Sequence, residues 1–180
     1  MPMEIQIPDT ELFNSESNEF IKIKGRKLVL EHSLVSVHKW EAKWKKPFLS
    51  KDPKTREESL DYVKCMTLSQ NVDPSLYFLI GSDILDTIQK YIDDPMTATV
   101  IKETNKRGKN SIITSELIYY WMVALQIPWE AQRWHLNQLL TLIEVCNIKN
   151  SPSKKMSKKE IYSRNQALNA ARRKAAHSNG

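Results

Sequence analysis

The pattern of the first thirty positions is mixed and poorly periodic, with short β-type runs in it. Residues 21–23 (Ile-Lys-Ile) alternate between apolar and polar, residues 28–30 (Leu-Val-Leu) are apolar throughout, and Gly25 lies between these two runs. Two β-type runs divided by a glycine predict a hairpin in which these runs pair with each other. A shorter alternation over residues 4–7 ends at Pro8 and predicts one short strand at most.

From Ser33 onwards the apolar residues follow the spacing of helices, with Leu34, Val37, Trp40 and Trp44 on one stripe. Three helices are expected between residues 33 and 95, each marked by a start or stop signal: Pro47 after the first, the capping box of Thr55 and Glu58 before the second, and Gly81 and Pro95 at the ends of the third.

Two more helices are expected in the centre of the fold. Residues 117–125 are apolar on every side and follow Thr114 as an N-cap, so this helix is expected to be fully buried. Pro128 fits the first turn of the next helix, which ends at residues 150–152. The polar and cationic segment 104–110 is expected to be a loop.

A last helix is expected near the C-terminus, with Ser157 and Glu160 as a second capping box. Its apolar residues are few, and Ile161, Leu168 and Ala175 form one thin seam with a spacing of seven. An isolated helix of this kind is marginal in water. It is therefore expected to be loosely attached until something binds it.

These patterns together predict a mainly α fold of five to six helices with a small N-terminal β hairpin and a basic C-terminal helical tail. Residues 1–150 are expected to form a compact domain that carries the hairpin. Residues 151–180 are expected to form the loosely attached tail.

The net charge of +6 is concentrated in that tail. The 180 residues include 27 basic and 21 acidic ones. Residues 151–180 hold eight of the basic residues and one acid, which leaves 19 basic and 20 acidic residues in the first 150. A nearly neutral body with a cationic tail indicates that the tail is solvated or meets an acidic partner.

Composition excludes several classes of protein. Two cysteines, Cys65 and Cys146, are too few for a disulfide framework and suit a reducing cytoplasm. The longest apolar run, residues 117–125, is about half as long as a membrane-spanning helix. No charged, apolar and small-residue leader opens the chain, so neither secretion nor membrane contact is expected.

The sequence holds no recognised set of catalytic or metal-binding residues. Its four histidines have no second ligand at the spacing of a zinc site, and its two cysteines are 81 positions apart. Four glycines cannot build a phosphate-binding loop, and no serine lies in a nucleophile elbow. We therefore expect a protein that is not an enzyme and needs no metal or cofactor.

Two features favour binding instead. The first is residues 38–46, where Trp40 and Trp44 alternate with lysines, as in proteins that stack bases and contact phosphates. Helical spacing places both rings on the stripe of Leu34 and Val37, however. The sequence therefore favours core anchors whose faces the lysine stems cover.

The cationic tail is the second feature. It can be a solvated helix, a docking segment for an acidic partner, or a nucleic-acid interface whose affinity falls steeply with salt. In the last case the residues in contact with phosphates would be the basic ones: Lys154, Lys155, Lys158, Lys159, Arg172, Arg173 and Lys174.

Several longer blocks resemble one family, the tail assembly chaperones of tailed bacteriophages. The similarity spans about residues 28 to 175, and these blocks carry it: Glu31–Ser36, Lys39–Glu41, Lys46–Leu49, Tyr91–Asp93, Met96–Thr99, Thr114–Met122, Trp134–Asn137, Leu139–Leu142, Val145–Asn147 and Lys154–Lys158.

This resemblance implies a protein of the host cytoplasm that binds the tape-measure protein and helps tail-tube subunits polymerise around it. It implies absence from the finished virion, brings no catalytic residues, and leaves the oligomeric state open, a homo-oligomer included. A structural tail or connector subunit and a nucleic-acid-binding protein remain the alternatives.

The resemblance motivates a hypothesis about the binding surface. An apolar groove would cover a helical stripe of the tape-measure protein, and aromatic residues and arginine dominate the energetics of such interfaces. The expected residues are Trp129, Arg133 and Trp134 with Ile161 and Leu168 of the tail. The alternative is that both tryptophans are core residues.

Overall fold

The computed structural model describes residues 2–14, 18–101, 112–151 and 158–176. The chain divides into two compact units, Met1–Cys146 and Asn147–Gly180, which are described separately. Their boundary falls four residues before the one expected from the sequence. The expected loop at 104–110 and Ser157 of the second capping box lie outside the described residues.

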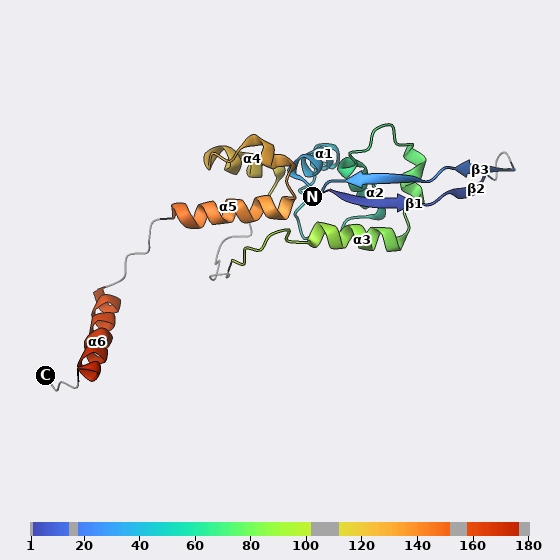
Figure 1. The fold of residues 1–180 in the computed structure, drawn as a ribbon. Coiled ribbons are helices and arrows are strands. Elements are labelled where there is room, and N and C mark those ends of the chain that lie inside the picture. The colour runs from blue at the N-terminus through green and yellow to red at the C-terminus, as the bar shows by residue number, and fades with distance from the viewer. Residues whose placement is uncertain (1, 15–17, 102–111, 152–157, 177–180) are drawn as a thin grey trace. The chain divides into compact units, whose positions relative to one another are not determined.

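The described residues form a mainly helical fold with a small antiparallel hairpin at the N-terminus, which confirms the predicted fold class (Figure 1). The strands are β1 (Met3–Ile7), β2 (Thr10–Asn14), β3 (Glu19–Ile23) and β4 (Arg26–Leu30). The helices are α1 (Leu34–Trp44), α2 (Arg56–Met66), α3 (Ser82–Asp93), α4 (Ser115–Ala124), α5 (Leu136–Asn150) and α6 (Lys158–Ala175), with 3-10 helices η1 (Pro74–Leu79) and η2 (Trp129–Arg133).

The predicted strand pairing is wrong. Strand β4 pairs with β1, with Ile5 opposite Leu28, and strand β3 pairs with β2. The register of the second pair continues that of the first, so the four strands form one antiparallel ribbon. Gly25 therefore lies within the ribbon and not at its turn. Ile5 lies opposite Leu28 and Met3 lies opposite Leu30, and the side chains of Ile5, Ile7, Leu28 and Leu30 are buried in the core.

At Gly25 the two sides of the ribbon come unusually close. A Cβ atom at this position would lie 2.2 Å from the carbonyl oxygen of Ile7 and 2.4 Å from the carbonyl carbon of Pro8. The backbone N–H of Gly25 donates to Asp9 Oδ1 at 2.6 Å. The interruption between β3 and β4 is thus a crossing point that only glycine fits.

The core of the first unit forms around α1 and α2, which pack on each other. Trp40 is 1% exposed and its Nε1 donates to the carbonyl oxygen of Glu58 at 2.9 Å. Trp44 is half-buried and donates to Asp61. The capping box of Thr55 and Glu58 opens α2 as predicted. The interpretation of Trp40 as a core anchor is confirmed, and its ring is not available to a base.

Helix α4 departs from the prediction of full burial. Only one face is buried, that of Ser115, Ile118 and Met122, which packs against α1. Tyr120 and Val123 on the other face are 65% and 67% exposed. The sequence 117–125 is apolar all round, but the face with Tyr120 and Val123 stays exposed in the described structure.

The second unit contains α6, and every side chain described in that helix is exposed. No helix in the described part of the chain is long and apolar enough to cross a membrane.

The crossing at Gly25 yields the first prediction. In Gly25→Ala the new methyl group meets backbone atoms, which cannot move aside cheaply, so the free energy of unfolding should fall by about 1–3 kcal/mol. Urea denaturation measures this difference. In the control Gly81→Ala the Cβ would meet nothing within 4 Å, so the change should be smaller, because only the preference of the α3 N-cap for glycine over alanine is lost, about 0.5–1 kcal/mol. Equal stability of the two variants would contradict the close crossing.

Candidate protein-binding surface

Four large apolar side chains of α4 and η2 are exposed although the unit has a well-formed core. Tyr120 and Val123 lie three residues apart on the outer face of α4. Trp129 begins η2 and Trp134 follows it, and these rings are 53% and 42% exposed. Together with the half-buried Tyr119 we call these residues the aromatic surface.

The aromatic surface has internal order. The rings of Tyr119 and Trp129 stack with their centroids 5.2 Å apart and an interplanar angle of 28°. The hydroxyl of Tyr119 donates to Gln132 Oε1 at 3.2 Å, and the ring of His38 meets the Tyr119 ring edge-on at 5.8 Å. Partial burial raises the pKa of the Tyr119 hydroxyl. Contacts with His38 and Gln132 therefore hold Tyr119 in place, and the Tyr119 ring in turn supports that of Trp129.

One buried carboxylate positions α4. Glu41 is buried on α1; its Oε2 accepts the backbone N–H of Ser115 at 2.7 Å, and its Oε1 accepts that of Phe48, also at 2.7 Å. Ser115 is the first residue of α4, where a negative charge also interacts favourably with the helix dipole. The Glu41 side chain thus fixes the start of the helix that carries Tyr120 and Val123.

Two buried histidines position the segment after η2. The rings of His32 and His135 lie 4.9 Å apart, and the backbone N–H of Leu136 donates to the carbonyl oxygen of His32 at 2.9 Å. His32 Nδ1 lies 2.5 Å from the Tyr62 hydroxyl. His135 follows Trp134 directly, so the buried imidazole fixes the backbone next to the exposed Trp134 ring.

Burial favours the neutral form of both imidazoles in the folded chain. Burial, with a smaller contribution from the neighbouring imidazole, lowers the pKa of His32 to about 3, and burial also lowers the pKa of His135. His135 Nε2 donates to the carbonyl oxygen of Tyr91 at 2.9 Å. Its Nδ1 is buried and has no hydrogen-bond partner among the described residues, so a proton there would lack an acceptor.

The structure places the predicted binding residues in two groups. Trp129, Arg133 and Trp134 are all exposed on or next to η2, so the alternative that both tryptophans are core residues is wrong. Ile161 and Leu168 are exposed on α6, in the second unit. Tyr119, Tyr120 and Val123 were not predicted from the sequence. A helix that is apolar on every side is expected to be buried, and its sequence does not show which face stays exposed.

Five of the seven residues proposed for nucleic-acid contact lie on the same tail helix. All five are exposed: Lys158, Lys159, Arg172, Arg173 and Lys174. Lys154 and Lys155 lie outside the described residues.

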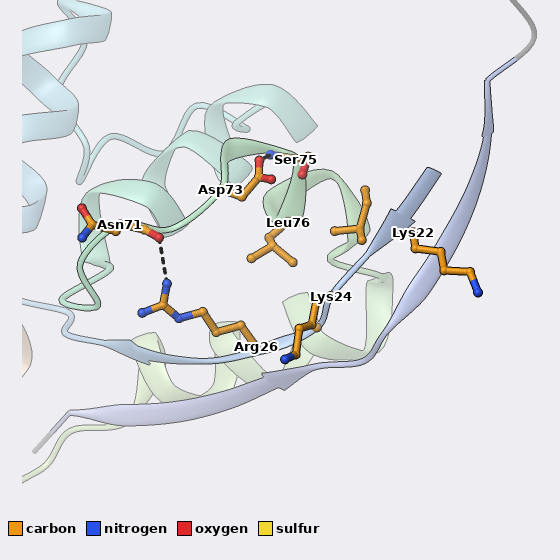
Figure 2. Close-up of a pocket in the computed structure, with 9 residues that line it drawn as sticks. Lys22, Lys24, Arg26, Asn71, Asp73, Ser75 and Leu76 are labelled. Carbon is orange, nitrogen blue, oxygen red and sulfur yellow. Dashed lines mark hydrogen bonds between the residues drawn. The ribbon is translucent and has the colours of Figure 1, made fainter. Parts of the chain in front are cut away.

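A cavity of about 620 Å³ lies where β3 and β4 pass η1 (Figure 2). Arg26 reaches toward Asn71 and donates to its carbonyl oxygen at 2.8 Å. Asp73 accepts the backbone N–H of Ser75 at 2.9 Å, and this bond lowers the pKa of the Asp73 carboxyl. These groups hold the ribbon beside η1 and cap that helix.

Within the described residues, no three His, Cys, Asp or Glu side chains gather so that they could hold a metal ion. Comparisons of the chain with protein-family models, with curated proteins and with solved structures found no match. The aromatic surface is therefore characterised by its geometry alone.

The histidine pair predicts acid sensitivity. An unfolded histidine takes up its proton near pH 6.5, whereas folded His32 does so near pH 3. The stability from the neutral ring is therefore complete above about pH 6.5. It should decline below that pH by about 1.4 kcal/mol per unit for His32, with a further loss from His135. Urea unfolding at pH 7, 6 and 5 measures this slope.

Because burial and not surface charge sets these pKa values, the slope should persist when salt screens exposed charges. Unfolding free energies that are equal at pH 7 and pH 5 would contradict the assignment of two neutral buried imidazoles.

Proposed function

We propose that this protein is a non-enzymatic assembly chaperone of tailed bacteriophages. It binds the tape-measure protein through the aromatic surface and assists the polymerisation of tail-tube subunits around it. It acts in the cytoplasm of the infected host and is not retained in the mature virion. The observation that carries the proposal is the exposure of Tyr120, Val123, Trp129 and Trp134 on a unit with a complete core.

An exposed apolar cluster of this kind is costly unless it has a partner, and such clusters mark protein-binding sites in soluble proteins. Tryptophan, tyrosine and arginine contribute most to interface energies, and the exposed Arg133 adds a cation beside the two tryptophans. The sequence blocks that resemble tail assembly chaperones, Thr114–Met122 and Trp134–Asn137, include most of this surface.

A binding surface made of a few aromatic side chains suits a reversible complex. An unsheathed tape-measure chain is long and helical and exposes apolar stripes that would aggregate, and a surface that covers one stripe prevents this. Tube subunits must later displace the chaperone, so a few aromatic contacts serve better than a large interface.

A structural tail or connector subunit could use the same surface. The two functions differ in the finished particle, because a structural subunit is present there in stoichiometric copies. Mass spectrometry of purified virions separates them.

The double variant Trp129→Ala, Trp134→Ala tests the proposed function. Removal of both rings should abolish co-purification of the tape-measure protein from infected cells, because truncation of such interface residues typically costs about 2 kcal/mol or more each. Circular dichroism should show an unchanged fold, since both rings are more than one-third exposed.

Phe78→Ala is the matched control. Phe78 is a 69% exposed aromatic residue on η1, outside the aromatic surface, and its loss should leave co-purification unchanged. A folded double variant that still retains the tape-measure protein would contradict the proposal.

The exposed cations of α6 favour one second candidate, a nucleic-acid-binding protein. That function predicts binding of generic DNA or RNA that disappears on deletion of residues 151–180 and weakens by orders of magnitude between 50 and 200 mM salt. Electrophoretic mobility shifts measure both effects. A deletion variant that binds nucleic acid like the full chain would exclude a role of the tail.

A further inference from the structure

The first unit has a second apolar feature that shares no residue with the aromatic surface. A groove of about 450 Å³ lies between α2 and α3, and Phe48 and Leu49 from the preceding loop also line it. Its volume lies within the range of ordinary binding sites, about 300–1,000 Å³.

The floor of the groove is an apolar helical stripe. Leu85, Ile88 and Ile92 follow one another along α3 at helical spacing and face Val63 of α2. Ile88 is buried, whereas Leu85 and Ile92 stay half-exposed. A trough of apolar side chains between two helices is the shape that accepts the apolar face of a third helix.

Acidic groups line the α3 side of the groove. Asp86 and Asp93 are exposed and seven residues apart, which is two turns or about 10 Å along the helix. Gln89 Nε2 donates to both oxygens of Asp93 at 3.0 Å and orients that carboxylate. No cation among the described residues forms an ion pair with either carboxylate.

The one cation that lines the groove is already engaged. Lys54 Nζ donates to the carbonyl oxygen of Phe48 at 2.8 Å and lies 4.3 Å from the centre of the Phe48 ring. Its partial burial lowers the pKa of the amine. Two carboxylates against this one cation give the described lining of the groove a net negative charge.

We propose that the groove between α2 and α3 binds an amphipathic helix of another polypeptide, one whose apolar stripe is flanked by lysine or arginine residues two turns apart. The stripe packs on Leu85, Ile88 and Ile92, and the two cations meet Asp86 and Asp93. This site goes beyond the proposed function, and it stands whether or not the aromatic surface binds the tape-measure protein.

The test uses the full chain and a synthetic helical peptide of about 18 residues, long enough to form a helix when bound. Leucines occupy one face of the peptide, and lysines flank them at a spacing of seven. A counterpart peptide carries glutamate in place of every lysine. Fluorescence anisotropy should detect binding of the lysine peptide and much weaker binding of the glutamate peptide.

Variants of the chain locate the contact. Asp86→Asn with Asp93→Asn should weaken binding of the lysine peptide about fivefold, as expected for two rim ion pairs. Asp83→Asn is the matched control, because Asp83 is an exposed carboxylate of α3 that does not line the groove. The affinity of this variant for the lysine peptide should equal that of the wild type. Equal affinity for both peptides, or no effect of the double variant, would overturn the proposal.

Methyl NMR separates this site from the aromatic surface. The lysine peptide should shift the methyl signals of Leu85 and Ile92 and leave those of Val123 unchanged. Shifts at Val123 alone would assign the peptide to the aromatic surface and overturn the groove site. Analytical sedimentation of the free chain is a last check. If the chain is a dimer and the lysine peptide dissociates it, the groove is occupied by a second copy of the chain. That result would also refute the proposal.

Discussion

The Glu41 carboxylate joins α1 to the loop that follows it and to the distant start of α4. It projects from α1, accepts the backbone N–H of Phe48 after the turn at Pro47, and accepts that of Ser115 at the start of α4. A buried carboxylate is costly unless its oxygens are hydrogen-bonded, and here each oxygen has a backbone donor. Because the carboxylate fixes where α4 begins, it determines which face of that helix packs on α1 and which face stays exposed.

The two surfaces proposed for binding depend on the hydrogen bonds of Glu41 in different ways. The aromatic surface is the outer side of α4 and η2, held from below by Glu41 and by the buried pair of His32 and His135. Phe48, whose backbone Glu41 also holds, is one of the residues that line the groove between α2 and α3. One surface offers aromatic rings and the other an apolar floor with acidic sides, so they suit partners of different chemistry.

The local signals in the sequence predicted most helices well, because a capping box or a proline acts within a few residues. The capping box of Thr55 and Glu58 and the buried position of Trp40 are examples. The strand pairing was wrong because alternation shows that a segment is extended but not which strand lies opposite. The exposure of α4 and the role of Glu41 depend on contacts 74 positions apart along the chain, and no local pattern contains them. Trp129 and Trp134 were predicted as binding residues from their type, but their exposure required the fold.

The central claim is that the outer face of α4 contacts the tape-measure protein in the cell. Its most direct measurement is a photo-cross-linking amino acid in place of Tyr120, activated by light during infection, with mass spectrometry of the adducts. The account predicts a cross-link to the tape-measure protein from position 120 and none from the equally exposed position 78 on η1. Absence of that adduct at position 120, or equal adducts at both positions, would contradict it.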